Sequence, residues 1–257
     1  MTAPTHDDLI AILGADRQFN ALDLSALEFA ALPEGVEYEF RDCEINNSRI
    51  SSNALQGSIW RNCKFRSAEF VGLNLWDAVF EKSMFFNPEN SVGSVFRFCN
   101  FRDVTFRDCD LTVSTLMGCE AYNAEFIRCK MWGTHFDKTD FEHEIGRNRR
   151  NMVTFDDCSL VDAVMRGGDF SSAVFNASDL SNADFSKASF RNSELNDCNL
   201  SGTDFDECDL SGADLRRSNL SGFDLGSVRN YQGLLISAGQ QHHLLRSIGV
   251  DVFPDED

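Results

Sequence analysis

The sequence predicts an all-β solenoid built from five-residue units, because three features repeat along much of its 257 residues. A large apolar residue recurs at every fifth position. The residue two positions before it is commonly small, and the residue between these two is often Asp, Glu or Asn. Neither the 3.6-residue period of a helix nor the two-residue period of a strand gives this spacing, whereas a fixed short repeat is typical of solenoids.

The large apolar positions form three series with a spacing of five residues. The series cover 40–85, 96–141 and 155–225, and within them only Ala121 is not large. We expect each large residue, and the small residue two before it, to face inward. The large side chains should then stack into one continuous apolar column, leaving the acidic residues outside. The residues chosen to test this orientation are Phe170, Leu200 and Leu215.

Two stretches, at about 88–93 and 144–152, interrupt the spacing. Their Pro, Gly, Asn and Ser content indicates loops. Loops on a rigid scaffold often carry function, and the second loop holds the densest basic cluster of an acidic chain, so we expect both to bind a partner. Insertions without a function are the alternative. The predicted binding residues are Pro88, Glu89, Asn90, Arg147, Arg149 and Arg150.

Residues 1–35 depart from the repeat and are predicted to form an N-terminal cap. Thr5 and Asp8 fit a capping box at the start of a short helix that runs to Leu13 and ends at Gly14. Residues 19–32 fit either an irregular first coil or a second helix.

Residues 230–257 follow the last repeat and are predicted to form a helix and a short strand. Ser237 and Gln240 have capping-box spacing, and Gly249 marks the end of a helix that reaches about Ser247. This segment caps the last coil, forms a dimer contact, or does both. The residues predicted to form a dimer interface are Leu244, Leu245, Ile248, Val250 and Val252, with the two valines in the strand.

The chain is strongly acidic, with 41 Asp and Glu against 23 Lys and Arg and a net charge of −18. Such a surface repels nucleic acid and anionic membranes and suits a basic partner, although acidity also serves solubility. The first residues lack the basic segment and apolar run of a signal peptide, and no apolar stretch reaches the length of a membrane span. A cytoplasmic location is therefore expected.

The sequence contains no recognisable catalytic set. The five histidines form no metal-binding or nucleophile motif, and a filled solenoid offers no interior pocket. We therefore expect a protein that is not an enzyme and that uses no cofactor and no metal.

The inward large residue, the inward small residue and the outward polar residue together resemble the signature of the pentapeptide-repeat family. The resemblance covers residues 36–229. It implies a right-handed quadrilateral β-helix, in which four five-residue faces complete one coil and the central residues stack inside.

A four-sided coil gives two further expectations. All nine cysteines stand at the small inward position before even-numbered faces, which confines them to two opposite sides, with Cys109 stacked on Cys129 and Cys99 on Cys119. None has CxxC spacing, so we expect buried thiols rather than a zinc or redox site. The two loops follow faces of opposite sides, so they should project in opposite directions.

Segments outside the regular repeat resemble the Qnr quinolone-resistance proteins and the MfpA-like group that binds topoisomerases. These segments are FNPENSVGSVFRFCNF, CDLTVSTL, GTHFDKTDF and NYQGLLISAGQQHHLLRSIGVDV. The resemblance implies a homodimer joined through its C-terminal module. It also implies binding to bacterial DNA gyrase and possibly topoisomerase IV, with protection from fluoroquinolones.

The functional hypothesis is therefore an acidic rod that mimics DNA. Acidic residues of the last coils would steer it to the basic DNA-binding surface of the enzyme, and the arginine loop would make the specific contact. The alternatives are an interaction scaffold with an unrelated partner, or a self-immunity protein against a gyrase-directed natural product. The acidic surface is predicted from Asp204, Asp209, Asp214 and Asp224.

Overall fold

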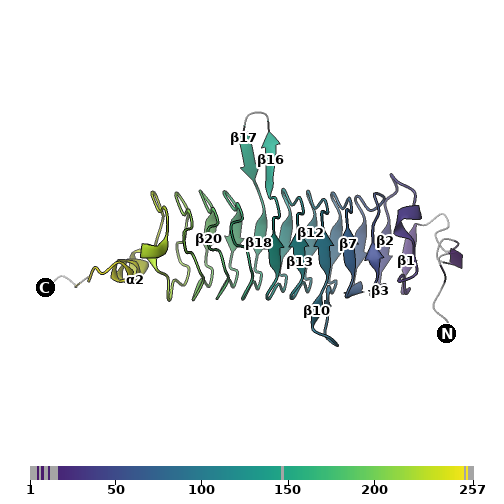
Figure 1. The fold of residues 1–257 in the computed structure, drawn as a ribbon, viewed down its shortest axis with the longest axis horizontal. Helices are drawn as coiled ribbons and strands as arrows, with labels where there is room; N and C mark the ends of the chain where they lie inside the picture. The colour runs from purple at the N-terminus through teal and green to yellow at the C-terminus, as the bar shows by residue number, and fades with distance from the viewer. Residues whose placement is uncertain are drawn as a thin grey trace.

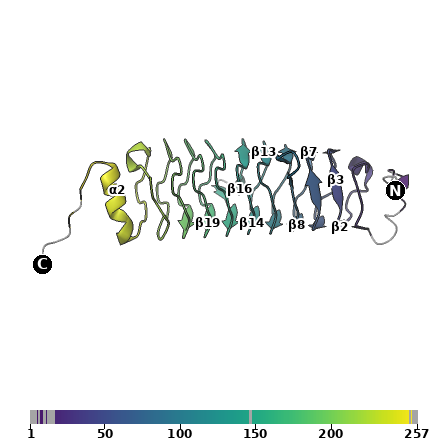
Figure 2. The ribbon, with the colours of Figure 1, turned by 90° about the horizontal axis from the view of Figure 1, so that it is seen from below.

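The chain forms an elongated shaft, with the N-terminal segment at one end and a helix at the other (Figure 1). This computed structural model describes residues 5, 7, 8, 11, 17–145, 148–251 and 253; for 143–145 and 148–151 it describes the backbone alone. Turned by 90°, the shaft keeps a uniform width and the C-terminal helix lies across its end (Figure 2). None of the helices described is long and apolar enough to cross a membrane.

The shaft is a right-handed quadrilateral β-helix, as predicted. Its longest sheet is parallel and nine-stranded, and pairs residues one coil apart, so that Phe40 lies beside Trp60, twenty residues later. The strands in spatial order are β1 (Gln18–Asn20), β2 (Glu39–Arg41), β5 (Ile59–Arg61), β8 (Val79–Glu81), β12 (Thr105–Arg107), β14 (Glu125–Ile127), β18 (Thr154–Asp156), β19 (Val174–Asn176) and β20 (Glu194–Asn196).

Two shorter parallel sheets cover other sides of the coil. Isolated parallel bridges continue all sides toward the C-terminal end. One sheet has the order β15 (His135–Asp137), β13 (Thr115–Met117), β11 (Val95–Arg97), β7 (Glu69–Val71) and β4 (Arg49–Ile50), and the other pairs β3 (Glu44–Asn46) with β6 (Lys64–Arg66).

The column of large apolar side chains fills the shaft. Every residue of the three five-residue series is buried, and Phe170, Leu200 and Leu215 are each 0% exposed, which confirms the predicted orientation. Along one side the rings of Phe80, Phe106 and Phe126 stack at centroid distances of 4.9 and 5.2 Å. Each coil thus covers the apolar side chains of the coil before it, and burial of such rings is the main favourable term in folding.

The outward Asp and Asn residues complete backbone hydrogen bonding at the turns. In the Asp179, Asn199 and Asp209 units, the side-chain Oδ1 accepts a hydrogen bond from the backbone N–H two residues later. An Asp or Asn at this position competes with extended pairing by capping a local turn. Consistently, no three-residue strand of the described shaft has Asp or Asn just before its central residue.

The cysteines stack as predicted. All nine are buried and free, and the bridges between Asn100 and Glu120 and between Asp110 and Lys130 place Cys99 beside Cys119 and Cys109 beside Cys129, one coil apart. Because the coils repeat at one strand spacing, equal inward positions of successive coils must meet.

The N-terminal end begins with an irregular coil rather than a second helix. Strand β1 pairs with β2, and the ring of Phe19 stacks on that of Phe40 at 5.0 Å. A 3-10 turn, η1 (Phe29–Ala31), follows. Thr5 and Asp8 make the reciprocal hydrogen bonds of a capping box, while Leu13 and Gly14 lie outside the described residues.

We predict that Phe106→Ala destabilises the shaft by about 3–5 kcal/mol, because it opens a cavity between two stacked rings. Denaturant unfolding followed by circular dichroism measures the change. The control is Arg107→Ala, a partly exposed neighbour on the same strand, for which less than about 1 kcal/mol is expected. Equal effects of the two substitutions would contradict the stacked-core account.

Candidate partner-binding surfaces

The two insertions project from opposite sides of the shaft, as the face count predicts (Figure 1). Neither shifts the register, because Phe80 pairs with Phe106 across the first and Phe126 with Phe155 across the second. Each insertion therefore lengthens one corner of one coil and leaves the stacking of the shaft unchanged.

The first insertion is a short antiparallel pair, β9 (Phe86–Asn87) and β10 (Val92–Gly93). The amides of Asn87 and Asn90 both donate to Ser67 Oγ at 3.2 Å, which ties the loop to the shaft. A Cβ on Gly93 would lie 2.4 Å from the backbone of Val113, so only glycine permits this close approach.

Of the residues predicted in the first insertion, Pro88, Glu89 and Asn90 are all exposed. Glu89 approaches Arg66 at 3.9 Å across the loop. The side chain of Asn90 is partly committed to Ser67, and Pro88 and Glu89 form the tip of the insertion.

The second insertion is a longer antiparallel hairpin, β16 (Glu142–Ile145) and β17 (Asn148–Asn151). It begins before the predicted loop, because Glu142 already pairs with Asn151. Arg149 and Arg150 lie on β17, and Arg147 lies outside the described residues. At the foot of the hairpin, the Tyr122 hydroxyl donates to Met152 Sδ at 3.3 Å.

The four acidic residues predicted as one surface are divided among different sides of the shaft. Asp204 and Asp224 are exposed and occupy equivalent positions one coil apart. Asp209 and Asp214 are each only 8% exposed, so the prediction of an acidic surface is wrong for them. Their side chains bond to residues two positions later in the chain. The carboxylate of Asp209 accepts a hydrogen bond from the backbone N–H of Ser211, and that of Asp214 accepts one from the guanidinium of Arg216.

These hydrogen bonds hold both buried carboxylates in the charged form. The guanidinium of Arg216 donates to Asp214 and lowers the pKa of its carboxyl. For Asp209, burial opposes ionisation, but hydrogen bonds from Ser211 outweigh it and lower the pKa. Carboxylates of this kind stabilise the fold and present little charge to a partner.

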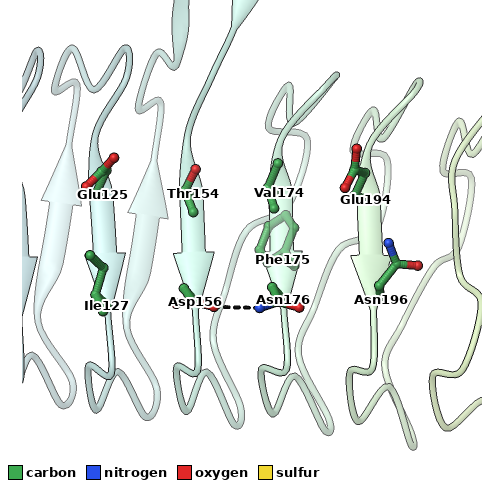
Figure 3. A pocket seen from close by; sticks show the side chains of 9 residues that line it. All are labelled: Glu125, Ile127, Thr154, Asp156, Val174, Phe175, Asn176, Glu194 and Asn196. Carbon is green, nitrogen blue, oxygen red and sulfur yellow. Dashed lines mark hydrogen bonds between the residues drawn. The ribbon is translucent and has the colours of Figure 1, made fainter.

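A shallow hollow of about 350 Å³ crosses strands β14, β18, β19 and β20 on the flat side of the shaft (Figure 3). Glu125 and Glu194 stand at its two ends, with Thr154 and Val174 between them. Asn176 donates to Asp156 at 2.6 Å within it. The hollow lacks the convergent polar groups of a catalytic cleft.

The C-terminal module divides between a cap and an exposed surface. The predicted capping box of Ser237 and Gln240 is present, followed by η3 (Ala238–Gln240) and α2 (Gln241–Ser247). Gln240 Nε2 also donates to backbone carbonyls of the last coils, and a 3-10 turn, η2 (Leu225–Ser227), lies against the helix.

Of the predicted dimer residues, Leu244 is 3% exposed and packs into the core of its own chain, so it is corrected to a cap residue. Leu245 is half-buried, whereas Ile248 and Val250 are exposed. Val250 is not in a strand, because a strand needs a partner and none lies beside it in the described chain; Val252 lies outside the described residues.

The described residues contain no group of three or more side chains suited to hold a metal. Burial raises the pKa of the Cys198 thiol to about 11 and that of Cys208 to about 12. Protonated, buried thiols are poor nucleophiles and poor ligands, so they act as small core residues.

Sequence reasoning missed the exposed aromatic residues Trp76, Phe98 and Trp132. Each stands one or two positions after a large inward residue of the repeat, and at these positions side chains point outward. That position in the repeat was the available signal.

Comparison with protein-family models places the repeat within a known family. The model for pentapeptide repeats matches residues 155–192 and 183–222, in eight copies. Residues 155–222 of this chain are pentapeptide repeats. A model for the SV2A/B/C luminal domain also matches residues 38–126 of the pentapeptide shaft.

Two curated pentapeptide-repeat relatives are similar to the chain. The quinolone resistance pentapeptide repeat protein QnrB96 of Scandinavium goeteborgense is 26% identical over 130 residues, covering 49% of this chain and 57% of the relative. QnrB4 of Escherichia coli is 25% identical over 97 residues, covering 38% of this chain and 45% of the relative. The similarity thus spans about half the length of these relatives.

A solved structure shares the fold of most of this chain. Full-length QnrB1, described as a plasmid-mediated fluoroquinolone resistance protein, matches with a TM-score of 0.75 and 22% identity, over 84% of this chain and all of that one. A trypsin-treated variant of QnrB1 matches with the same TM-score at 21% identity. These matches establish the shared fold.

We predict that Asp214→Asn removes part of the acid sensitivity of the protein. A carboxyl whose pKa is lowered by folding adds stability above its unfolded pKa of about 3.9, and this stability is lost as pH falls through the lower native value. The melting temperature of the variant should therefore lie below that of the native chain at pH 7, and the difference should shrink below about pH 3.

Asp206→Asn serves as the control, because Asp206 is exposed and makes no ion pair among the described residues. It should leave the pH profile of the melting temperature almost unchanged. A pH-independent difference for Asp214→Asn would contradict the assignment of an ionised, paired carboxylate.

Proposed function

We propose that this pentapeptide-repeat protein binds a bacterial type II topoisomerase, DNA gyrase or topoisomerase IV, and protects it from fluoroquinolones or related poisons. The observation that carries the proposal is the sequence similarity to a quinolone resistance protein over 130 residues. The two insertions on opposite sides of the shaft provide the surfaces for specific contact.

The charge of the shaft supports attraction to a basic DNA-binding surface. B-form DNA carries one negative charge per about 1.7 Å of its axis, and proteins that grip it are correspondingly basic. Asp204 and Asp224 present exposed carboxylates one coil apart, and the net charge of the chain is −18. Charge steering of this kind brings the shaft to the enzyme and weakens as salt rises.

The hairpin β16–β17 then makes the specific contact in this mechanism. Its strand β17, which contains Arg149 and Arg150, projects away from the shaft (Figure 1). Guanidinium groups held on a projecting hairpin can pair with acidic groups of the enzyme while the shaft occupies its basic surface. Such contacts would disfavour the drug-trapped cleavage complex.

Replacing the three arginines Arg147, Arg149 and Arg150 with Gln should raise the protein concentration needed for protection by about tenfold or more, because each lost ion pair costs binding free energy. The measurement is gyrase supercoiling in the presence of ciprofloxacin. The charge-matched control replaces Arg49, Arg191 and Arg246, which are spread over the shaft and the C-terminal helix.

Equal loss of protection in both triple variants would contradict a specific role for the hairpin. If the native protein gives no protection and does not bind gyrase, the topoisomerase proposal fails and an interaction scaffold with another partner becomes the better account.

We also propose that the C-terminal module joins two chains. Tyr231, Leu235, Ile248 and Val250 expose apolar side chains at one end of the shaft, with exposed fractions of 43–47%. Several large apolar side chains exposed at one end of a molecule are typical of an interface. A dimer would bury these residues and give Val250 the strand partner that it lacks in one chain.

Ile248→Asp with Val250→Asp should therefore convert the protein to a monomer, measured by light scattering after size-exclusion chromatography, because charges cannot be buried unpaired at an apolar contact. The control is Gln241→Asp with His242→Asp, on exposed positions of the same helix. A native chain that is monomeric at micromolar concentration would refute the proposed dimer.

A further inference from the structure

The exposed large apolar side chains of the described chain fall into two zones. The first zone lies on the part of the shaft that carries the insertions, and the second lies at the C-terminal end. No such side chain is found between them, within residues 153–230. Exposed apolar groups that gather in one zone mark contact sites. The first zone contains Trp76, Val92, Phe98, Val113, Trp132 and Met152.

Trp76 is held in a fixed orientation although its side chain is 46% exposed. Its indole Nε1 donates to Asp103 Oδ2 at 2.8 Å, and the other oxygen of Asp103 accepts from Asn123 Nδ2 at 2.7 Å. Its backbone N–H donates to Asn74 Oδ1. The ring therefore keeps one position without a packed neighbour on its outer side, and a ligand would lose little entropy on ordering it.

Two adjoining hollows follow the edge of the shaft at Trp76, and together they are called the Trp76 groove. The first, of about 420 Å³, is lined by Trp76, Asp77, Asp103, Thr105, Asn123 and Glu125. The second, of about 530 Å³, begins at Asp77 and extends toward the N-terminal end past Asn74, Gln56, Glu34 and Glu37.

The three carboxylates that line the first hollow, Asp77, Asp103 and Glu125, make no ion pair in the described part of the chain. By contrast, Glu81 of the same region pairs with Arg61 at 2.8 Å. Basic side chains thus neutralise the neighbouring face, and the Trp76 groove keeps its negative charge.

The chemistry of the groove selects a cationic occupant with a flat surface. An exposed indole face attracts cations, most often a guanidinium, and carboxylates beside it supply acceptors for the guanidinium N–H groups. An anion would be repelled, and an apolar side chain would leave the three carboxylates near it poorly hydrated. We propose that the Trp76 groove binds an arginine side chain on an exposed segment of a partner protein.

The edge that carries the groove leads to the second insertion. Asp77 N donates to Arg102 O, Asp103 N donates to Tyr122 O, and the Tyr122 hydroxyl reaches Met152 at the foot of the β16–β17 hairpin. The groove and the foot of the hairpin therefore lie along the same edge of the shaft, where one partner could contact both. The groove would accept an arginine whichever protein carries it, so this inference does not depend on a topoisomerase being the partner.

The test uses the full-length protein and an acetylated, amidated hexa-arginine peptide as the probe. The background variant is Trp132→Phe, which leaves Trp76 as the exposed tryptophan because Trp60 is only 1% exposed. Saturable quenching of tryptophan fluorescence by the peptide is expected. In the same assay, Asp77→Asn with Asp103→Asn and Glu125→Gln should weaken binding by about tenfold or more.

The matched control is Asp157→Asn with Asp162→Asn and Glu194→Gln. Asp157 and Asp162 occupy left-handed corner positions like Asp77 and Asp103, and Glu194 lies on the same sheet as Glu125, so the change in net charge and the kind of position are equal. A loss of less than about threefold is expected for this control, since only long-range charge is removed.

A second variant separates the indole from the charge. Trp76→Ala, measured by fluorescence anisotropy of labelled hexa-arginine, should weaken binding by about fivefold or more, and hexalysine should bind native protein more weakly than hexa-arginine. Circular dichroism verifies that each variant keeps the β-helix. Equal weakening in the two triple variants, or unchanged binding by Trp76→Ala, would overturn the proposal.

Discussion

The fold depends on the stacking of equivalent side chains between successive coils. Neighbouring strands lie about 4.8 Å apart, so each inward side chain rests on the residue one coil before it and is covered by the residue one coil after it. Phenylalanine rings stack on rings, and cysteines occupy equivalent positions one coil apart. The same spacing satisfies the backbone, because N–H and C=O groups pair from coil to coil. Both ends would expose this column, which explains the N-terminal irregular coil and the helix across the C-terminal end.

Because side chains fill the interior of the shaft, any binding site must lie on its outer surface, and few parts of that surface are suited to one. The flat sides carry ladders of ion pairs, and many outward carboxylates and amides cap turns of their own chain. The net charge of −18 is therefore distributed unevenly over the surface, because many carboxylates are paired or capped and others are free. Exposed charge and exposed apolar surface meet near the insertions, where the rigid shaft also supports the two projecting segments.

The insertions show how a solenoid acquires specific features without losing its core. An added segment at a corner interrupts neither the ladder nor the stacked column, because the chain re-enters the next face at the same register. Gly93 lets the first insertion pass directly over the backbone of the next coil, and paired strands give the second its own hydrogen bonding. Binding surfaces of this type can diverge while the shaft remains constant, in accord with the low identity and shared fold of the relatives.

The sequence by itself determined the solenoid, the inward residues, the stacking of cysteines and the opposite directions of the insertions, because these depend only on counting residues in a rigid five-residue period. The sequence also predicted the C-terminal capping box, because Ser237 and Gln240 lie only three residues apart in the chain. Only the tertiary structure decided which outward residues are free. Asp209 and Asp204 are indistinguishable in the repeat, but Asp209 is buried and has Arg229 of the next coil beside it at 3.9 Å, whereas Asp204 is exposed. The Trp76 groove likewise depends on residues from several coils and from the N-terminal coil, which no local pattern brings together.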